Sequence, residues 1–308
     1  MWILAALLAL AAIGLVFEAL AVRSDARTRP APGVILEVDG VRLHANCTGS
    51  GSPTVVLESG LGDSSLVWAE VQHRLAARHR VCSYDRAGIA WSAAGAEWDW
   101  QIGMRQLRGL LAAAGERPPY VLVGHSSGVN YMRLYALSHP EEVAGLVLIE
   151  PPILAEVPPG VVLLLKAARA SIGALSRLCV IRLLGKLNLM QILSAGSTPP
   201  QQLSEAAGFV YGPGSIRAAM REISALPETI RQMNELSVPG ALGSMPVCVV
   251  AARPASGAPA ALVEGQEAIA ALSTRGRVIT AEGSHFIHYD HPELIVSAVE
   301  NVLEASPR

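Results

Sequence analysis

The central chemical feature of the sequence is Gly-His-Ser-Ser-Gly at residues 124–128, which places Ser126 between two glycines. An apolar, strand-forming run at 120–123 precedes this motif, and a helical pattern from Val129 to about Ser138 follows it. A sharp turn from strand to helix exposes a serine side chain, and its strained backbone requires small flanking residues. The following helix directs its free N–H groups at the same place. We therefore predict that Ser126 is a nucleophile; a turn without chemistry is the alternative.

A serine hydroxyl becomes an effective nucleophile only when a base removes its proton. Among the eight histidines, His285 follows the last predicted strand on a Gly-Ser loop, at the edge of the sheet where the serine motif lies. We predict that His285 is this base and that His125 packs beside the nucleophile. His285, His288, Asp290 and His291 are close in sequence but lack the spacing of familiar ligand sets, so we expect no metal site.

Strand and helix patterns alternate around these residues. An Asp-Gly pair between Val34–Val38 and Val41–Asn46 predicts a hairpin. The later strands are apolar runs at 54–58, 80–84, 120–123, 143–149, 246–251 and 277–280. Apolar strands separated by helices favour an α/β fold with a mostly parallel sheet covered on both faces. Residues 153–240 interrupt this order with helical stretches, and we predict a helical cap inserted between core segments 34–152 and 241–308.

The N-terminal segment 1–22 is apolar except for Glu18. Some 20 helical residues, at about 1.5 Å each, cross a hydrocarbon core of about 30 Å, so we predict a single-span anchor followed by a linker at 23–33. A cleaved secretory signal, with its site at Ala19-Leu20-Ala21, and a buried helix are the alternatives. Arginines at 23, 27 and 29 follow the apolar run, and the positive-inside rule then favours a cytoplasmic catalytic domain.

The overall composition narrows the function further. Hydrophobic residues make up 51% of the chain and charged residues 16%, and the net charge is −2. No basic tail or charge block indicates nucleic acid as a partner. The four cysteines have no C-x-x-C spacing, and we expect no disulfide framework and no zinc site. Three of them fall within strand-like runs, where cysteine behaves as a small buried hydrophobic residue. The four are Cys47, Cys82, Cys179 and Cys248.

Four motifs, in this order, resemble those of the serine α/β-hydrolase family. Ser59-Gly60-Leu61-Gly62 stands where the family has its His-Gly oxyanion loop, and residues 85–92 are similar to its Asp-Arg-x-Gly-x-Gly-x-Ser loop. Residues 124–128 resemble its nucleophile elbow, and Gly283-Ser284-His285 resembles the loop that bears its catalytic histidine. The resemblance covers 34–152 and 241–305 and implies the α/β-hydrolase fold.

The chain departs from the family pattern at two positions. Ser59 replaces the oxyanion-loop histidine, and Ala90 replaces the second glycine of the Asp-Arg loop. The first change leaves the backbone intact, so the resemblance still implies an oxyanion hole made by the N–H groups of Leu61 and Ser127. The second change is expected to matter only for structure.

The acid of a catalytic triad is missing from its usual place. In most of the family this acid follows the strand after the cap, but residues 251–257 contain no Asp or Glu. Glu150 ends the strand after the serine motif, which is an alternative acid position in some family members. We predict the triad Ser126, Glu150 and His285. Glu282, Asp290 or a triad without an acid are the alternatives.

The resemblance implies a serine hydrolase that needs no cofactor. No aspartate occupies the nucleophile position, so dehalogenase and epoxide hydrolase activities are not expected. The stretch 157–204 has no Asp or Glu, and it sets basic residues among apolar ones: Lys166, Arg169, Arg177, Arg182 and Lys186. A cap of this composition either packs its apolar face on the core or contacts lipid headgroups and admits apolar chains.

We therefore expect hydrolysis of an ester with an apolar acyl or alcohol part, a lipid-like small molecule, by a protein held at the membrane through residues 1–22. An aminopeptidase similar to proline iminopeptidases is the enzymatic alternative. It would hold a substrate amine with acidic cap residues, for which Glu205, Glu222, Glu228 and Glu235 are available. A binding module that has lost catalysis is the remaining alternative.

Overall fold

The computed structural model describes residues 1–96, 98–152, 159–187, 201–253 and 258–306. Within them, eight strands form one sheet in the order β1-β2-β4-β3-β5-β6-β7-β8. β2 pairs antiparallel with both β1 and β4, and the remaining neighbours pair parallel, which confirms the predicted fold class. The strands are β1 Val34–Val38, β2 Val41–Thr48, β3 Thr54–Glu58, β4 Val81–Asp85, β5 Tyr120–His125, β6 Val143–Ile149, β7 Val247–Arg253 and β8 Gly276–Glu282.

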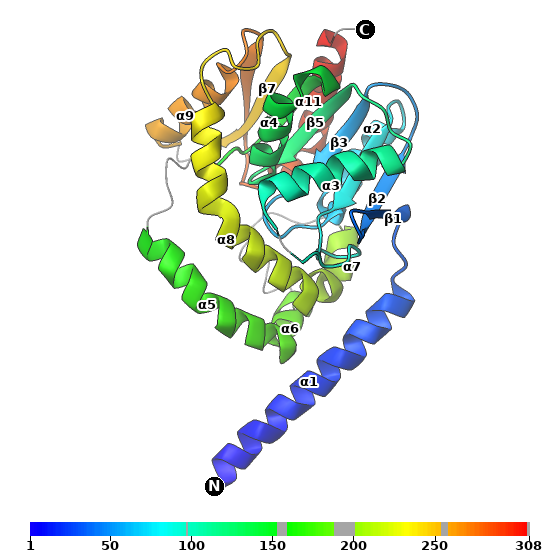
Figure 1. The fold of residues 1–308 in the computed structure, drawn as a ribbon, viewed down its shortest axis with the longest axis vertical. Coiled ribbons are helices and arrows are strands. Elements are labelled where there is room, and N and C mark those ends of the chain that lie inside the picture. The colour runs from blue at the N-terminus through cyan, green and yellow to red at the C-terminus, as the bar shows by residue number, and fades with distance from the viewer. Residues whose placement is uncertain (97, 153–158, 188–200, 254–257, 307–308) are drawn as a thin grey trace.

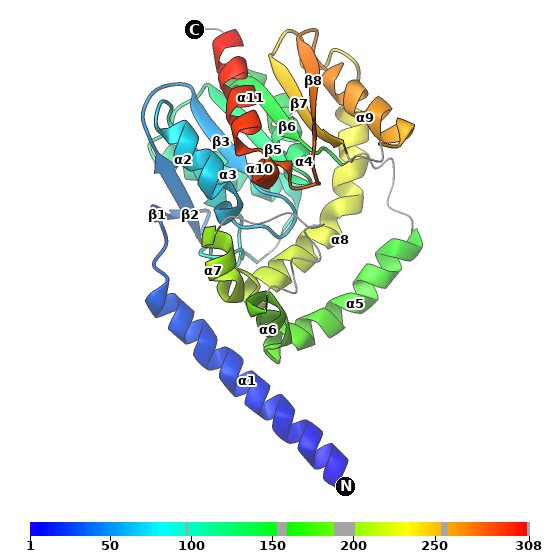
Figure 2. The ribbon, with the colours of Figure 1, turned by 180° about the vertical axis from the view of Figure 1, so that it is seen from behind.

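Helices cover both faces of the sheet (Figures 1 and 2). One face carries α3 Trp100–Ala113, α4 Gly128–Ser138 and α9 Ala260–Ala270, and the other carries α2 Ala69–Ala76 and α11 Pro292–Ala305, with the short helices η1 Ser65–Trp68 and α10 Ile287–Asp290 beside them. Successive residues of β5 serve opposite faces, because side chains alternate along a strand. Leu122 packs in the cluster of Leu110, whereas Val121 packs in the cluster of Val299.

The described residues between β6 and β7, in the region predicted to be a cap, form four helices. They are α5 Pro159–Arg177, α6 Val180–Lys186, α7 Gln201–Val210 and α8 Pro213–Leu236. The longest, α8, lies against α4 and α5. The described part of 153–240 is therefore mostly helical, while 153–158 and 188–200 lie outside the described residues.

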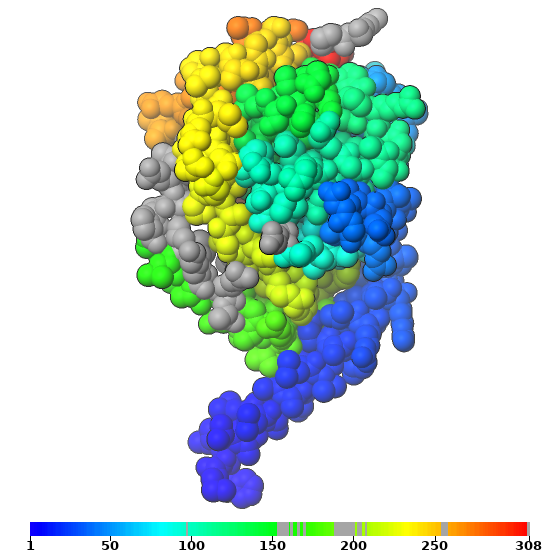
Figure 3. All heavy atoms as spheres, in the orientation of Figure 1, coloured from blue at the N-terminus to red at the C-terminus, as the bar shows by residue number. Residues whose placement is uncertain are grey.

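The N-terminal helix is longer than predicted. α1 spans Trp2–Thr28, so the first part of the predicted linker 23–33 is helical. The sequence places no helix-breaking proline before Pro30, which lets the helix continue past the apolar run. Within the described chain, α1 is the one helix long and apolar enough to cross a membrane. Its N-terminal half stands clear of the rest of the molecule (Figure 3).

A disulfide joins Cys47 and Cys82, which corrects the expectation of four unpaired cysteines. The two residues face each other across the antiparallel strands β2 and β4. Their separation of 35 residues gave no signal in the sequence, because only the strand register brings them together. Cys179 and Cys248 are free thiols.

Candidate active site

The turn between β5 and α4 has the strained geometry expected for a nucleophile. Ser126 has a φ of +52°, in the left-handed region that only a few residue types tolerate. The residues two positions before and after it must be glycine: a Cβ on Gly128 would lie 2.6 Å from the Ser59 carbonyl oxygen, and one on Gly124 would meet the backbone of Gly128 at 2.8 Å. The Ser126 N–H donates to the Ile149 carbonyl oxygen at 2.9 Å, which ties the turn to β6.

The structure brings the three predicted triad residues together. His285 lies between β8 and α10, and its Nε2 is 3.0 Å from Ser126 Oγ. Its Nδ1 is 3.3 Å from Glu150 Oε2, directly after β6. The other carboxylate oxygen of Glu150 accepts the Ala252 N–H at 2.6 Å, so the carboxylate is fixed from the neighbouring strand. This arrangement is the one in which an acid orients a histidine that contacts a serine.

The alternative acids have other contacts. Asp290 Oδ2 accepts both the backbone N–H and the hydroxyl of Ser284, each at 3.0 Å. Asp290 therefore holds the loop that carries His285. Glu282 is exposed, and its carbonyl oxygen is 2.9 Å from His291 Nε2. Among the described carboxylates, Glu150 is the one bonded to the imidazole of His285.

His125 packs beside the nucleophile, as predicted. Its Nε2 donates to the His285 carbonyl oxygen at 2.8 Å, and its ring lies 4.2 Å from that of His288. Burial, with a smaller contribution from the nearby His285, lowers the pKa of His125 to about 3, so its ring is neutral at physiological pH. A neutral ring cannot repel the imidazolium that would form on His285 during catalysis.

The loop after β3 turns one backbone N–H away from the protein interior. The Gly60 carbonyl oxygen accepts Arg86 Nη2 at 2.6 Å. In a trans peptide the carbonyl and the following N–H point in opposite directions, so the Leu61 N–H faces away from Arg86. Neither the Leu61 N–H nor the Ser127 N–H has an acceptor among the described residues. Both N–H groups are thus unengaged near Ser126, where an oxyanion would need them.

A buried ionic cluster fixes this loop, and sequence reasoning missed it. Arg86 bonds to both oxygens of Glu222 on α8, at 2.8 and 2.9 Å, and it pairs with Glu58 at the end of β3. Glu222 Oε2 also accepts the Gly62 N–H at 2.9 Å. The Asp-Arg motif was visible in the sequence, but its partner in the cap was not, because the two are 136 residues apart.

The same Asp-Arg loop contains Ala90, which replaces the second glycine of the family pattern. Ala90 has a φ of +42°, a conformation that glycine adopts without cost and alanine does not. Its N–H donates to Ser215 Oγ of the cap at 3.0 Å. The expectation that this substitution is structural agrees with its position, because Ala90 has no described contact with Ser126 or His285.

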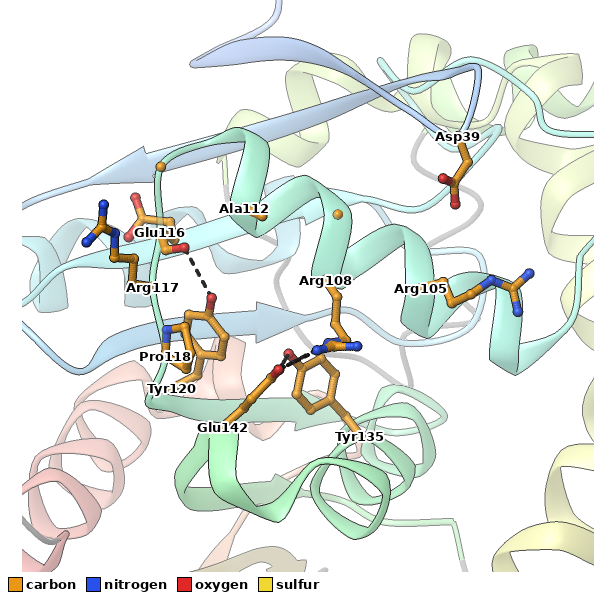
Figure 4. Close-up of a pocket in the computed structure, with 12 residues that line it drawn as sticks. Asp39, Arg105, Arg108, Ala112, Glu116, Arg117, Pro118, Tyr120, Tyr135 and Glu142 are labelled. Atoms are coloured by element: carbon orange, nitrogen blue, oxygen red, sulfur yellow. Dashed lines mark hydrogen bonds and ion pairs between the residues drawn. The ribbon is translucent and has the colours of Figure 1, made fainter.

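A separate surface pocket of about 730 Å³ lies beside α3, around the ion pair of Arg108 and Glu142 (Figure 4). Tyr120 in its wall begins β5, whereas Ser126 follows the other end of that strand, so the pocket is at the opposite edge of the sheet. Two groups in the described chain could hold a metal by proximity. One group is Cys47, Cys82 and Glu116, in which the two cysteines form the disulfide. The other is His139, Glu141 and Glu142, and its Glu142 lines this pocket.

Comparison with known proteins finds matches to part of this chain. The model for the alpha/beta hydrolase fold matches residues 53–171. The uncharacterized protein YqjL of Bacillus subtilis (strain 168) is 35% identical over 118 residues, which is 37% of this chain and 46% of YqjL. A 2-hydroxy-6-oxononadienedioate/2-hydroxy-6-oxononatrienedioate hydrolase of Paraburkholderia xenovorans (strain LB400) is 34% identical over 125 residues, which is 37% of this chain and 42% of that protein. The chain thus spans less than half the length of these relatives.

A solved structure extends the likeness to nearly the whole fold. The enol-lactonase from Burkholderia xenovorans LB400 has a TM-score of 0.66 and 16% identity, covering 88% of this chain and 100% of the lactonase. At this identity the likeness establishes the fold alone. The sheet order, the strand–turn–helix around Ser126, the family model matched over residues 53–171 and the likeness to this solved structure together show that the chain has the α/β-hydrolase fold.

Proposed function

We propose that the protein is a serine hydrolase that cleaves an ester through an acyl-enzyme. The observation that carries the proposal is the continuous chain of contacts from Ser126 Oγ through His285 to Glu150, at 3.0 and 3.3 Å. Such a chain activates a hydroxyl that is otherwise a weak nucleophile. The two unengaged N–H groups of Leu61 and Ser127 support the same reading.

In the proposed reaction, Ser126 Oγ attacks the carbonyl carbon of the ester and its proton passes to His285 Nε2. Glu150 holds His285 with Nδ1–H toward the carboxylate and stabilises the imidazolium. The oxyanion accepts the N–H groups of Leu61 and Ser127. When the intermediate collapses, the leaving alcohol takes the proton from His285. A water molecule then repeats these steps on the acyl-enzyme, with His285 again as base, and releases the acid.

The apolar cap and α1 support a lipid-like substrate. Several large apolar side chains of the cap are exposed rather than packed on the core, including Leu163, Leu164 and Leu183. An exposed apolar surface of this kind is typical of a site that meets lipid or an apolar ligand. We propose that α1 keeps the protein at a membrane and that the substrate is an ester with an apolar acyl or alcohol part.

The aminopeptidase alternative loses support from three of the four cap carboxylates named for it. Glu222 is buried and bonded to Arg86 and Gly62, so it has no capacity left for a substrate amine. Glu228 and Glu235 are exposed and paired with Arg231 on the outer side of α8. The binding-module alternative does not account for a serine, a histidine and a carboxylate aligned at bonding distance.

A fluorophosphonate probe tests the proposal, because it reacts with an activated serine and not with an idle one. Intact-mass measurement of the full chain should show one adduct, and Ser126→Ala should abolish it. Ser127→Ala and Ser284→Ala serve as matched controls on neighbouring hydroxyls and should still be labelled. Labelling that survives in Ser126→Ala, or a wild-type chain that stays unlabelled while folded, would refute the proposed nucleophile.

A further inference from the structure

One face of α1 is committed to the cap. Of the α1 residues, Ala11, Gly14, Glu18, Ala21 and Asp25 are the ones that are not fully exposed. Their spacing of three and four residues aligns them along one side of the helix. The remaining apolar residues of α1 point elsewhere and are exposed, so packing against the protein does not account for them.

The backbone of α1 touches the corner between α5 and α6 directly. A Cβ built on Gly14 would lie only 2.7 Å from the Leu178 carbonyl oxygen. Only glycine permits this approach, because any side chain would collide with the backbone of the corner. Gly14 therefore marks the point, part-way along the apolar segment, where the cap meets α1.

Buried ion pairs hold this contact. Arg182 of α6 bonds to Glu18 at 2.7 to 3.0 Å and to Asp25 at 2.5 Å. The side chains of Arg182 and Glu18 are only 2% and 4% exposed. This pairing explains how an apolar helix accommodates a glutamate, because a buried charge is tolerated only when it is paired. It also removes Arg182 from the basic residues that could contact lipid headgroups.

The position of the contact limits how α1 can enter a bilayer. At about 1.5 Å per residue, the free part Trp2–Ile13 is about 18 Å long, short of the roughly 30 Å of a hydrocarbon core. The residues that complete the distance, up to about Val22, already carry the cap corner. If α1 crosses the bilayer as proposed, the corner must enter the near leaflet with it.

We infer that the corner of α5 and α6 is a membrane-inserted surface that contacts lipid acyl chains, and that α1 and the cap form one rigid membrane-binding unit. This inference rests on the proposed anchoring through α1. The apolar side chains of the corner suit contact with lipid acyl chains, because they are partly exposed: Leu175 by 40%, Val180 by 37%, Leu183 by 54% and Leu187 by 59%. The exposed basic residues Arg177 and Lys186 flank them, and their long side chains can reach toward lipid phosphates.

This placement specifies how substrate would arrive. The cap helix α8 lies against α5 and carries Glu222, which holds the loop beside Ser126. A corner embedded in the leaflet thus sets the active site close to the acyl region rather than at the end of a flexible tether. The substrate class that fits is an ester that resides in the lipid phase and reaches the cap from the membrane.

Site-specific photocrosslinking tests the inference in the full chain. Leu183 or Leu187 is replaced by p-benzoylphenylalanine, and the protein is reconstituted into vesicles of phosphatidylethanolamine and phosphatidylglycerol. After irradiation, mass measurement should find lipid adducts at both positions. Val238 is the matched control: it is a 56% exposed apolar residue just beyond Leu236, where α8 ends, and it should give none. Figure 1 shows this C-terminal end of α8 next to α9, away from α1.

The outcomes separate this inference from the proposals on which it rests. A chain that floats with the vesicles but forms no lipid adduct at Leu183 and Leu187 would overturn the inserted corner and leave α1 as a simple anchor. Crosslinked dimers instead of lipid adducts would assign the surface to a second copy of the chain. A chain absent from the vesicle fraction would refute the anchor itself, while fluorophosphonate labelling of Ser126 reports on the hydrolase independently.

The ion pairs provide a second test. Arg182→Gln should release the corner from α1 and lower the lipid adducts at Leu187 severalfold, whereas Arg177→Gln, an exposed neighbour, should leave them nearly unchanged. Ser126 labelling in each variant shows that the domain is folded. If Arg182→Gln is folded and gives undiminished adducts, the ion pairs do not hold the corner in the membrane.

Discussion

Glu222, in the middle of the cap helix α8, accepts the backbone N–H of Gly62 at 2.9 Å while its carboxylate also bonds to Arg86. One cap residue therefore fixes the loop after β3. The residue before Gly62 in this loop is Leu61, whose N–H has no acceptor among the described residues. Arg86 also holds this loop, because its guanidinium donates to the carbonyl oxygens of Ser59 and Gly60. The cap and the proposed oxyanion hole are thus mechanically connected.

Glu222→Gln should lower kcat by tenfold or more, with a much smaller change in KM. The reason is that a misplaced oxyanion donor weakens transition-state binding, and losing one such donor costs about 10² to 10³ in kcat in known cases. Steady-state kinetics on an apolar ester measures both constants. Glu228→Gln and Glu235→Gln, exposed on the same helix, are the controls and should keep wild-type kinetics. Unchanged kcat in a folded Glu222→Gln would exclude this positioning role.

Glu150→Gln should reduce turnover by orders of magnitude without unfolding the protein. An imidazole without its acid loses both its fixed tautomer and its alignment, and the equivalent change in a serine protease lowers kcat by about 10⁴. The comparison is made with Glu264→Gln and Glu282→Gln, two exposed carboxylates on neighbouring elements. Asp290→Asn is a less neutral control because Asp290 holds Ser284. Activity retained in Glu150→Gln and lost in one of the others would reassign the acid.

Asp63→Asn should stabilise the protein at alkaline pH and not at acid pH. Burial, together with the nearby Glu222, raises the pKa of Asp63 from 3.8 to about 6, although Arg86 opposes the shift. A carboxyl with a raised pKa destabilises the folded state above that pKa, and the cost disappears as the pH falls below the unfolded value. Two pKa units correspond to at most about 3 kcal/mol, and partial solvent exposure lowers this figure.

The measurement for Asp63 is the difference in Tm between variant and wild type across pH. The difference should be largest above about pH 7, shrink through pH 6 and approach zero near pH 4. Asp99→Asn is unsuitable as a control because Asp99 caps α3, whereas Asp39→Asn changes a carboxylate in the exposed β1–β2 turn. A gain at Asp63 that does not vary with pH would show that the carboxyl titrates normally.

Ala90→Gly should raise the free energy of unfolding by about 0.5 to 1 kcal/mol. The left-handed conformation costs alanine about 1 to 2 kcal/mol, and the greater freedom of glycine in the unfolded chain offsets part of the gain. Chemical denaturation measures the difference. The matched change Ala268→Gly, at an exposed position within α9, should instead lose about 1 kcal/mol. Destabilisation at Ala90 would mean that its side chain contributes packing that outweighs the strain.

Alkylation of the unfolded chain without reductant should modify two thiols, Cys179 and Cys248, and four after reduction. Disulfides persist in oxidising compartments, so the Cys47–Cys82 disulfide favours a catalytic domain outside the cytoplasm. The arginines that follow the apolar segment favour the opposite side of the membrane by the positive-inside rule. Intact mass gives the count directly. Four modified thiols in protein taken from cells under rapid acid quenching would place the domain in a reducing compartment.

The sequence by itself determined the fold class and pointed to Ser126 and His285 as the proposed nucleophile and base. Apolar strands alternating with helices specify a parallel sheet with two covered faces, and a serine between small residues at a strand–helix turn marks the edge where His285 also lies. These are local signals, because periodicity and turn chemistry act over a few residues. The same locality made Glu150 a candidate, since it ends the strand next to the turn.

Only the tertiary structure decided which distant segments of the chain are in contact. The Cys47–Cys82 disulfide depends on the register of two antiparallel strands. The bonds of Glu222 to Arg86 and Gly62, and of Arg182 to Glu18 and Asp25, connect the cap to residues more than 100 positions away. A charged side chain in a sequence does not reveal its partners, because any opposite charge could pair with it until packing excludes water and brings particular ones within reach.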